Sequence, residues 1–207
     1  DALYQGFDII KTKKILTVNH IKEIHSTLEQ NDAGFRKQSG TVLKNPKTGE
    51  IKLIPPQNPK DIEELMSNLV DYINDETLED FDSLVKMAII HYQFESIHPF
   101  YDGNGRTGRI INILYLILKD LLDIPVLYLS RYIITHKADY YRLLQEVRTE
   151  DKWEEWILYI LEAVEQTSLE TIELINRISD LMIKIQDKIS RELPKIYSKD
   201  LVEILFM

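Results

Sequence analysis

The chain is organised around one stretch, His98-Pro99-Phe100-Tyr101-Asp102-Gly103-Asn104-Gly105-Arg106-Thr107-Gly108-Arg109. Gly103 and Gly105 allow the backbone to turn with positive φ and to approach a ligand closely, so that consecutive N–H groups converge on an anion. The strongly helical segment that follows, Arg106 to about Leu122, adds first-turn N–H groups and the positive end of a helix dipole. These features predict a phosphate site.

The charged side chains of the stretch fit the same chemistry. Arg106 and Arg109 are three positions apart and project from neighbouring positions on the helix, where their guanidinium groups can bind phosphates. Asp102 would repel phosphate by itself, so we expect it to be a ligand of Mg²⁺, which uses one or two carboxylates together with phosphate oxygens. His98 is the expected proton acceptor. The alternative is a tight turn at the start of a helix, with His98 capping or packing.

The stretch resembles the signature of the Fic family, H-x-F-x-[DE]-G-N-G-R-x-x-R, with every defining position filled. The resemblance covers roughly residues 17–165 and implies a mainly α fold, a helical bundle with a β-hairpin flap beside the active-site loop. It also implies a protein adenylyltransferase, which transfers AMP from ATP to a Ser, Thr or Tyr hydroxyl of a target protein and releases pyrophosphate. The stretch is called the signature loop below.

The resemblance assigns roles to individual residues. His98 would deprotonate the target hydroxyl, Asp102 would hold Mg²⁺ across the α- and β-phosphates, and Phe100 would point inward and anchor the loop. Arg106 would bind the β-phosphate and Arg109 the γ-phosphate of ATP. The whole phosphate-binding set is Gly103, Asn104, Gly105, Arg106 and Arg109.

Composition narrows the class of protein. The chain has 207 residues, of which 44% are hydrophobic, enough for one substantial core. It has no cysteine, which excludes disulfides and thiolate sites and fits a reducing compartment, so we expect a cytoplasmic protein. A formal charge of −9 argues against nucleic-acid binding by these residues. The chain has no uncharged apolar run of about 18 residues, so no membrane segment is expected.

Helix signals recur ahead of the signature loop. Residues 1–16 are a lead-in with helical tendency around residues 2–10 and no assigned role. Thr17 is expected to cap a helix that ends near Asn31 to Gly34, and Asn58 with Pro59 is expected to open another. A third helix is expected from about Asp80 to Ile97, with Phe81 on its apolar side.

A hairpin is expected at about residues 39–56. Its strands are Thr41-Val42-Leu43 and Ile51-Lys52-Leu53-Ile54, joined through the turn-rich residues 45–49. On pattern alone, a surface hairpin without a role is an equal alternative. However, residues 53–59 are similar to the I-P-P-x-x-P segment of Fic proteins. The resemblance implies a flap whose edge, at Lys52, Leu53 and Ile54, pairs with an extended segment of the target.

Other side chains receive less specific predictions. His25 is expected to be a packed, hydrogen-bonded core histidine, because no second His, Asp or Glu falls at metal spacing beside it. His91 is expected to be a buried histidine that orients a neighbour. Tyr141 and Leu144 resemble the Y-Y-x-x-L segment that lines the adenine pocket in this family, and core packing is the alternative. Ser130 is expected to cap the helix after Pro125.

The C-terminal third predicts further helices. Residues 153 to about 192 are a long helical stretch of one or two helices, which Pro194 ends, and residues 198–205 begin a new helix. The expected domains are a lead-in at 1–16, a Fic domain at 17–165 and a C-terminal helix at 166–194. A truncated segment follows at 195–207, of the winged-helix type that follows the Fic domain in relatives. We therefore expect the chain to be part of a longer protein.

Regulation and chemistry leave alternatives open. Many Fic proteins are restrained by a helix of pattern [ST]-x-x-x-E-[GN], which does not occur in these 207 residues, and we expect that segment upstream of Asp1. Transfer of another phosphate-containing group, removal of AMP, and a non-catalytic ATP-binding regulatory module are the alternative functions. Self-modification and oligomerisation also stay open.

Overall fold

The protein is described by a computed structural model that covers residues 1–44, 49, 51–77 and 82–206. Contacts divide the chain into two compact units, Asp1–Val164 and Glu165–Met207. The described residues form helices and one two-stranded antiparallel sheet, which confirms the mainly α class. In this part of the chain, no helix has the length and apolar character needed to cross a membrane. The predicted domain limits stay predictions.

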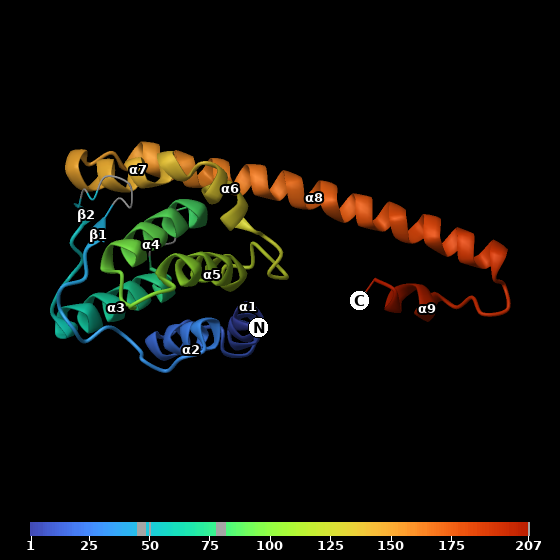
Figure 1. The fold of residues 1–207 in the computed structure, drawn as a ribbon, viewed down its shortest axis with the longest axis horizontal. Helices are drawn as coiled ribbons and strands as arrows, with labels where there is room; N and C mark the ends of the chain where they lie inside the picture. The colour runs from blue at the N-terminus through green and yellow to red at the C-terminus, as the bar shows by residue number, and fades with distance from the viewer. Residues whose placement is uncertain (45–48, 50, 78–81, 207) are drawn as a thin grey trace. The chain divides into compact units, whose positions relative to one another are not determined.

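The first unit is a bundle built around α5 (Figure 1). Its first five helices are α1 (Ala2–Lys13), α2 (Val18–Glu29), α3 (Pro59–Asn74), α4 (Ser83–Ile97) and α5 (Asn104–Leu118). Helix α5 packs against α1, α2 and α4, and its residues Ile111, Leu114 and Ile117 are completely buried. Burying each such side chain stabilises the fold by about 1.5–3 kcal/mol. The helix predicted after the signature loop is therefore confirmed, although it ends at Leu118 rather than near Leu122, because Asp120 turns the chain with a φ of 54°.

Two predicted helix starts are confirmed by their caps. The Thr17 hydroxyl accepts a hydrogen bond from the His20 N–H at 3.2 Å, and Asn58 accepts one from the Lys60 N–H at 3.0 Å. Helix α4 begins at Ser83, where the Asp82 carboxylate accepts from the Leu84 N–H at 2.8 Å. The predicted start of that helix, at Asp80 and Phe81, lies outside the described residues.

The lead-in, residues 1–16, contributes a helix to the bundle, a role that its weak sequence pattern did not predict. Helix α1 packs against both α2 and α5. At Gly6 the approach is so close that an added Cβ would lie 2.6 Å from a methyl carbon of Leu114 on α5. Residues 2–13 therefore belong to the bundle and cover one side of its central helix.

The described residues after α5 form the helices α6 (Leu129–Thr135), α7 (Lys137–Glu150), α8 (Trp153–Glu192) and α9 (Lys199–Ile204). The predicted long stretch after residue 153 is one helix, which continues from the first unit into the second. The prediction for Ser130 is wrong. The cap position of α6 is Tyr128, and the Ser130 hydroxyl accepts a hydrogen bond from Arg109 instead.

The hairpin is present but short. Strands β1 (Leu43–Lys44) and β2 (Ile51–Leu53) pair antiparallel, Leu43 with Leu53 and Lys44 with Ile51, with an irregularity between the two pairs. Most of the predicted connecting turn, residues 45–48, lies outside the described residues. Because the sheet has two strands among the described residues, β2 has an edge that no neighbouring strand covers.

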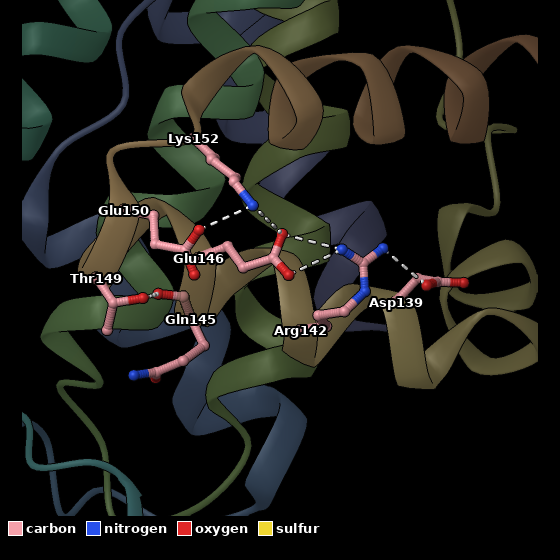
Figure 2. Close-up of polar contacts among 7 residues, drawn as sticks. All are labelled: Asp139, Arg142, Gln145, Glu146, Thr149, Glu150 and Lys152. Carbon is pink, nitrogen blue, oxygen red and sulfur yellow. Dashed lines mark hydrogen bonds and ion pairs between the residues drawn. The ribbon is translucent and has the colours of Figure 1, made fainter.

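The outer face of α7 carries a chain of ion pairs, which Figure 2 shows. Arg142 contacts Asp139 and Glu146, each at 2.9 Å, and Lys152 contacts Glu150 at 2.9 Å. Exposed pairs of this kind add little to stability, because solvent screens them. They mark the solvent face of α7, while the opposite face buries Tyr140, Leu143, Leu144 and Val147 in the core.

Candidate active site

The signature loop connects α4 to α5 through two left-handed residues. His98 ends α4 with a φ of 49°, and its N–H donates to the Phe94 carbonyl at 3.0 Å. Gly103 has a φ of 73° and directly precedes α5. A positive φ is costly for most side chains and free for glycine, which explains the glycine at this turn. The two helices therefore meet at a tight loop that carries His98 at one end and the α5 N-terminus at the other.

Asn104 and Phe100 fix the shape of this loop. The side chain of Asn104 is buried and forms two hydrogen bonds with the backbone of Phe100, accepting from its N–H and donating to its carbonyl, each at 2.9 Å. The Phe100 ring is completely buried, as predicted. Its face stacks on His25 at a centroid distance of 3.6 Å. Because its amide is used within the loop, Asn104 can offer a ligand its backbone N–H rather than its side chain.

His25 and His91 are packed histidines, as predicted. His25 Nε2 lies 2.9 Å from the Asp102 carbonyl oxygen, which can only accept, so this nitrogen donates and ties α2 to the loop. His91 is completely buried and forms a hydrogen bond with the Tyr140 hydroxyl at 3.0 Å. Burial, with a smaller contribution from the charge of Arg109, lowers the pKa of His91 to about 3.

His98 is held in its neutral form. Burial lowers the pKa of His98 to about 4, the positive charge of Arg36 contributes in the same direction, and the Glu95 backbone and the Asp102 carboxylate partly oppose both. A neutral imidazole can accept a proton at pH 7. The geometry therefore gives the predicted base the protonation state that the role needs.

The start of α5 has the geometry of the predicted anion site. Helical geometry leaves the N–H groups of Asn104, Gly105 and Arg106 without acceptors inside the helix. The Gly103 N–H is already used, because it donates to the Asp102 carboxylate at 2.7 Å. The site thus combines free first-turn donors with the positive end of a buried, rigidly packed helix.

Arg106 is paired with a carboxylate that the sequence did not single out. Its Nη2 lies 2.7 Å from an oxygen of Glu29, the last residue of α2. The side chain of Glu29 is 13% exposed and lies directly over Gly103, where an added Cβ would overlap its carboxylate. A negative group therefore occupies the position from which Arg106 was predicted to bind the β-phosphate.

Arg109 has different partners from Arg106. Its Nε donates to the Ser130 hydroxyl on α6 at 2.7 Å. The Glu95 carboxylate is close by, and an added Cβ on Gly108 would lie 2.8 Å from one of its oxygens. Burial raises the pKa of Glu95 to about 7, while the charge of Arg109 acts to lower it. Arg109 therefore has a neighbouring carboxyl whose charge changes near neutral pH.

The structure separates the two residues predicted for the adenine pocket. Leu144 is 9% exposed and belongs to the hydrophobic core, whereas Tyr141 on the same helix is 54% exposed. Burial of its hydroxyl raises the pKa of Tyr141, and the charges of Glu95 and Arg109 also act on it. The hydroxyl of Tyr141 therefore lies close enough to Arg109 to feel its charge, whereas Leu144 is part of the core.

The predicted flap residues lie on and after β2. Lys52 and Leu53 are in the strand, and Ile54, which follows it, is 60% exposed. The carbonyl of Lys52 accepts a hydrogen bond from Arg148 on α7 at 3.5 Å, so the strand is linked to the helix that carries Tyr141.

Residues 15–116, which contain the bundle centre and the signature loop, match the model described as the Fic/DOC family. The chain belongs to this family. The Fic fold recurs in the crystal structure of a Fic family protein from Desulfovibrio desulfuricans G20, with a TM-score of 0.68 and 22% identity, over 90% of this chain and 56% of that one.

Two curated Fic relatives are named as adenylyltransferases. The protein adenylyltransferase fic-1 of Caenorhabditis elegans is 41% identical over 56 residues, 27% of this chain and 11% of the worm protein. A probable protein adenylyltransferase of Aquifex aeolicus is 37% identical over 100 residues, 48% of this chain and 28% of that protein. The chain therefore spans less than a third of the length of these two relatives.

Asp102 is the Fic residue predicted to hold Mg²⁺. One oxygen of its exposed carboxylate accepts from the Gly103 N–H, which leaves the other oxygen for a ligand. No group of three or more potential metal-ligating side chains occurs among the described residues. A lone carboxylate beside an anion site suits Mg²⁺, which takes the rest of its ligands from phosphate and water, and does not suit a metal that needs an all-protein site.

Three site residues of this Fic protein escaped the sequence analysis: Glu29, Arg36 and Glu95. Glu29 and Arg36 lie more than 60 residues from their partners in the signature loop, so no local pattern joins them. Glu95 had an available signal, because a carboxyl three residues before His98 on one helix faces the same side. The sequence pattern therefore indicated no partner for any of the three.

Proposed function

We propose that this protein is an adenylyltransferase that transfers AMP from ATP to a Ser, Thr or Tyr hydroxyl of a target protein. The observation that carries the proposal is the neutral imidazole of His98 at one end of a tight loop whose other end opens the anion-binding N-terminus of α5. The names of the curated relatives support the same reaction.

The reaction needs one proton acceptor and one anion site. His98 takes the proton of the target hydroxyl as its oxygen forms a bond to the α-phosphorus of ATP. The bond from the α-phosphorus to the bridging oxygen of the β-phosphate breaks, and pyrophosphate leaves with the negative charge. The first-turn N–H groups of α5, with Arg106 and Arg109, stabilise that charge. Mg²⁺ held by Asp102 would neutralise the phosphates further when bound.

Arg106 must change partner for this role. In the structure it contacts Glu29, so a triphosphate that reaches Arg106 has to displace that carboxylate. The exposed half of the Arg106 side chain leaves room for such an exchange. Arg109, which donates to Ser130 on α6, receives the γ-phosphate of ATP, and Tyr141 on α7 lines the adenine pocket. Leu144 contributes to the adenine pocket from the core beneath.

The target segment docks at the flap. Strand β2 has an edge that no described strand covers, so an extended peptide can add to it through backbone hydrogen bonds. Lys52, Leu53 and Ile54 then contact the side chains of that peptide, and its hydroxyl reaches His98. Recognition of this kind constrains the backbone of the target more than its sequence.

The test is labelling with ATP that carries an isotope at the α-phosphate, in a mixture of candidate targets and Mg²⁺. We expect His98→Ala to lower transfer by about 10²–10⁴-fold, the usual contribution of a positioned base, and to leave ATP binding unchanged. His136→Ala is the matched control, because His136 is exposed and outside the loop. Equal labelling by His98→Ala and the unchanged protein would refute the proposal.

The mass of the product separates this reaction from its rivals. An AMP adduct adds roughly 329 Da, the mass of AMP less water, to the modified residue. A different mass would indicate transfer of another phosphate-containing group. ATP binding without any adduct would indicate a regulatory module, and loss of AMP from a premodified target would indicate the reverse reaction.

A further inference from the structure

Arg36 is a fully buried arginine whose guanidinium is bound by backbone carbonyls. The residue is 1% exposed. Its Nε donates to the His98 carbonyl at 2.8 Å, and its Nη2 donates to the carbonyls of Ile97, at 3.3 Å, and Pro56. The carbonyls of Ile97 and His98 lie at the C-terminal end of α4, and His98 is the proposed base. Pro56 lies three residues after the end of strand β2. One side chain therefore contacts both the base and the exit of the flap.

The backbone beside Arg36 is attached to the signature loop as well. The Arg36 N–H donates to the Pro99 carbonyl at 2.8 Å. The N–H groups of Lys37 and Gln38 both donate to the Tyr101 hydroxyl, at 2.9 and 3.3 Å. These bonds hold the segment that leads into β1 against the loop.

The two ends of the flap are also joined at its base. The Gln57 side chain accepts from the Gly40 N–H at 2.6 Å and donates to the Thr41 carbonyl at 3.0 Å. Pro55 and Pro56 make the chain between β2 and Gln57 stiff, since proline fixes φ. A shift of the Pro56 carbonyl is therefore transmitted to β2.

The chemistry explains why this position needs arginine. The last carbonyls of a helix lack partners within it, and a cation at that end is favourable. A guanidinium has five donors in a planar fork, so it can bind carbonyls on two separate segments at once, whereas a lysine ammonium is a point charge on a flexible stem. A buried cation is costly unless such bonds are made.

We propose that Arg36 is a positioning residue that sets the place of the flap edge relative to His98. In the proposed reaction, on which this part rests, that spacing decides whether the hydroxyl of a docked target strand meets the imidazole. The link between the flap and the base is a property of the fold and holds whatever the reaction is.

The test compares Arg36→Lys, which keeps the charge but loses the fork, with Arg36→Met, which loses both. Tyr101→Phe removes the second attachment and leaves Arg36 intact. Lys37→Met is the matched control, because the Lys37 side chain is exposed and its backbone bond stays. Hydrogen exchange of the amides of residues 51–54 is measured by mass spectrometry, together with ATP binding by calorimetry.

We expect the flap amides to exchange at least about tenfold faster in both Arg36 variants and in Tyr101→Phe, with ATP affinity within about twofold of the unchanged protein. Transfer to a target should lose at least about tenfold in kcat/KM for the target, while KM for ATP stays the same. Unaltered flap exchange in folded Arg36→Lys and Tyr101→Phe would overturn the proposal. Should Arg36→Met not fold, these two variants decide the question alone.

A further readout separates positioning from general loss of structure. The charged groups acting on the His98 imidazole are Arg36 and Asp102, with the backbone of Glu95. The NMR titration midpoint of His98 should rise in Arg36→Met and stay in place in Arg36→Lys, although flap exchange rises in both. If the unchanged protein transfers no AMP, the function is wrong, and exchange and titration still decide the role of Arg36.

Discussion

Replacement of Glu29 by Gln should make this protein bind ATP more tightly. Glu29 lies over Gly103 and contacts Arg106 at 2.7 Å, where the triphosphate is expected. The substitution keeps the size of the side chain and removes its charge. It therefore removes both the partner that competes for Arg106 and the repulsion between a carboxylate and the incoming phosphates.

The exposure of the two side chains sets the size of the effect. Arg106 is 52% exposed and Glu29 is 13% exposed, so solvent screens the pair in part. Exposed ion pairs contribute about 0.2–1 kcal/mol, and hydrogen bonds to charged groups about 1.5–3 kcal/mol. A value of about 1–2 kcal/mol between these limits corresponds to an affinity gain of about 5- to 30-fold.

The assay is calorimetric titration with a non-hydrolysable ATP analogue and Mg²⁺ at fixed ionic strength. Glu23→Gln is the matched control, because Glu23 is exposed on the same helix and its substitution changes the net charge by the same amount. It should alter the affinity by less than about twofold. Unchanged or weaker binding by Glu29→Gln would refute the reasoning, since the carboxylate would then not compete with the nucleotide.

Further predictions concern the loop itself. Asn104→Ala should lower the free energy of unfolding by about 2–4 kcal/mol, because two buried backbone groups lose their partners; chemical denaturation, with exposed Asn31→Ala as control, measures this. Gly103→Ala should cost about 1–2 kcal/mol from its φ of 73° and more from overlap with Glu29, and a melting curve with unchanged Tm would contradict that. His98 in the nucleotide-free protein should titrate near pH 4 by NMR. Its folded pKa is below the unfolded value, so its contribution to stability is present above about pH 6.5 and is lost as pH falls toward 4.

The sequence correctly predicted those features of the fold that depend on residues close together in the chain. Thr17 and Asn58 cap their helices as expected, because capping needs only a side chain and N–H groups two or three positions later. The helix predicted after the signature loop is likewise present as α5. Ser130 shows the limit, because its hydroxyl has the chemistry of a cap but is bound by Arg109, 21 residues earlier.

The candidate site divides in the same way. The twelve-residue loop carries His98, Asp102 and the start of α5 together, so their proximity follows from the sequence. Arg36 gave no signal, because a single arginine in a polar stretch predicts a surface residue, and its burial depends on carbonyls at Pro56, Ile97 and His98. Interactions between distant segments were therefore the part that required coordinates.

The signature loop and the hairpin have separate proposed roles, and this affects how the sequence of such a protein can evolve. The proposed catalytic groups lie at the junction of α4 and α5, whereas the proposed choice of target depends on a few residues of the short hairpin. Sequence drift in the hairpin can alter which proteins are modified without disturbing the chemistry. Residues 41–54 can therefore be exchanged between relatives to change which target protein is bound. Arg36 and Gln57 should be retained, because they attach the hairpin to the rest of the fold.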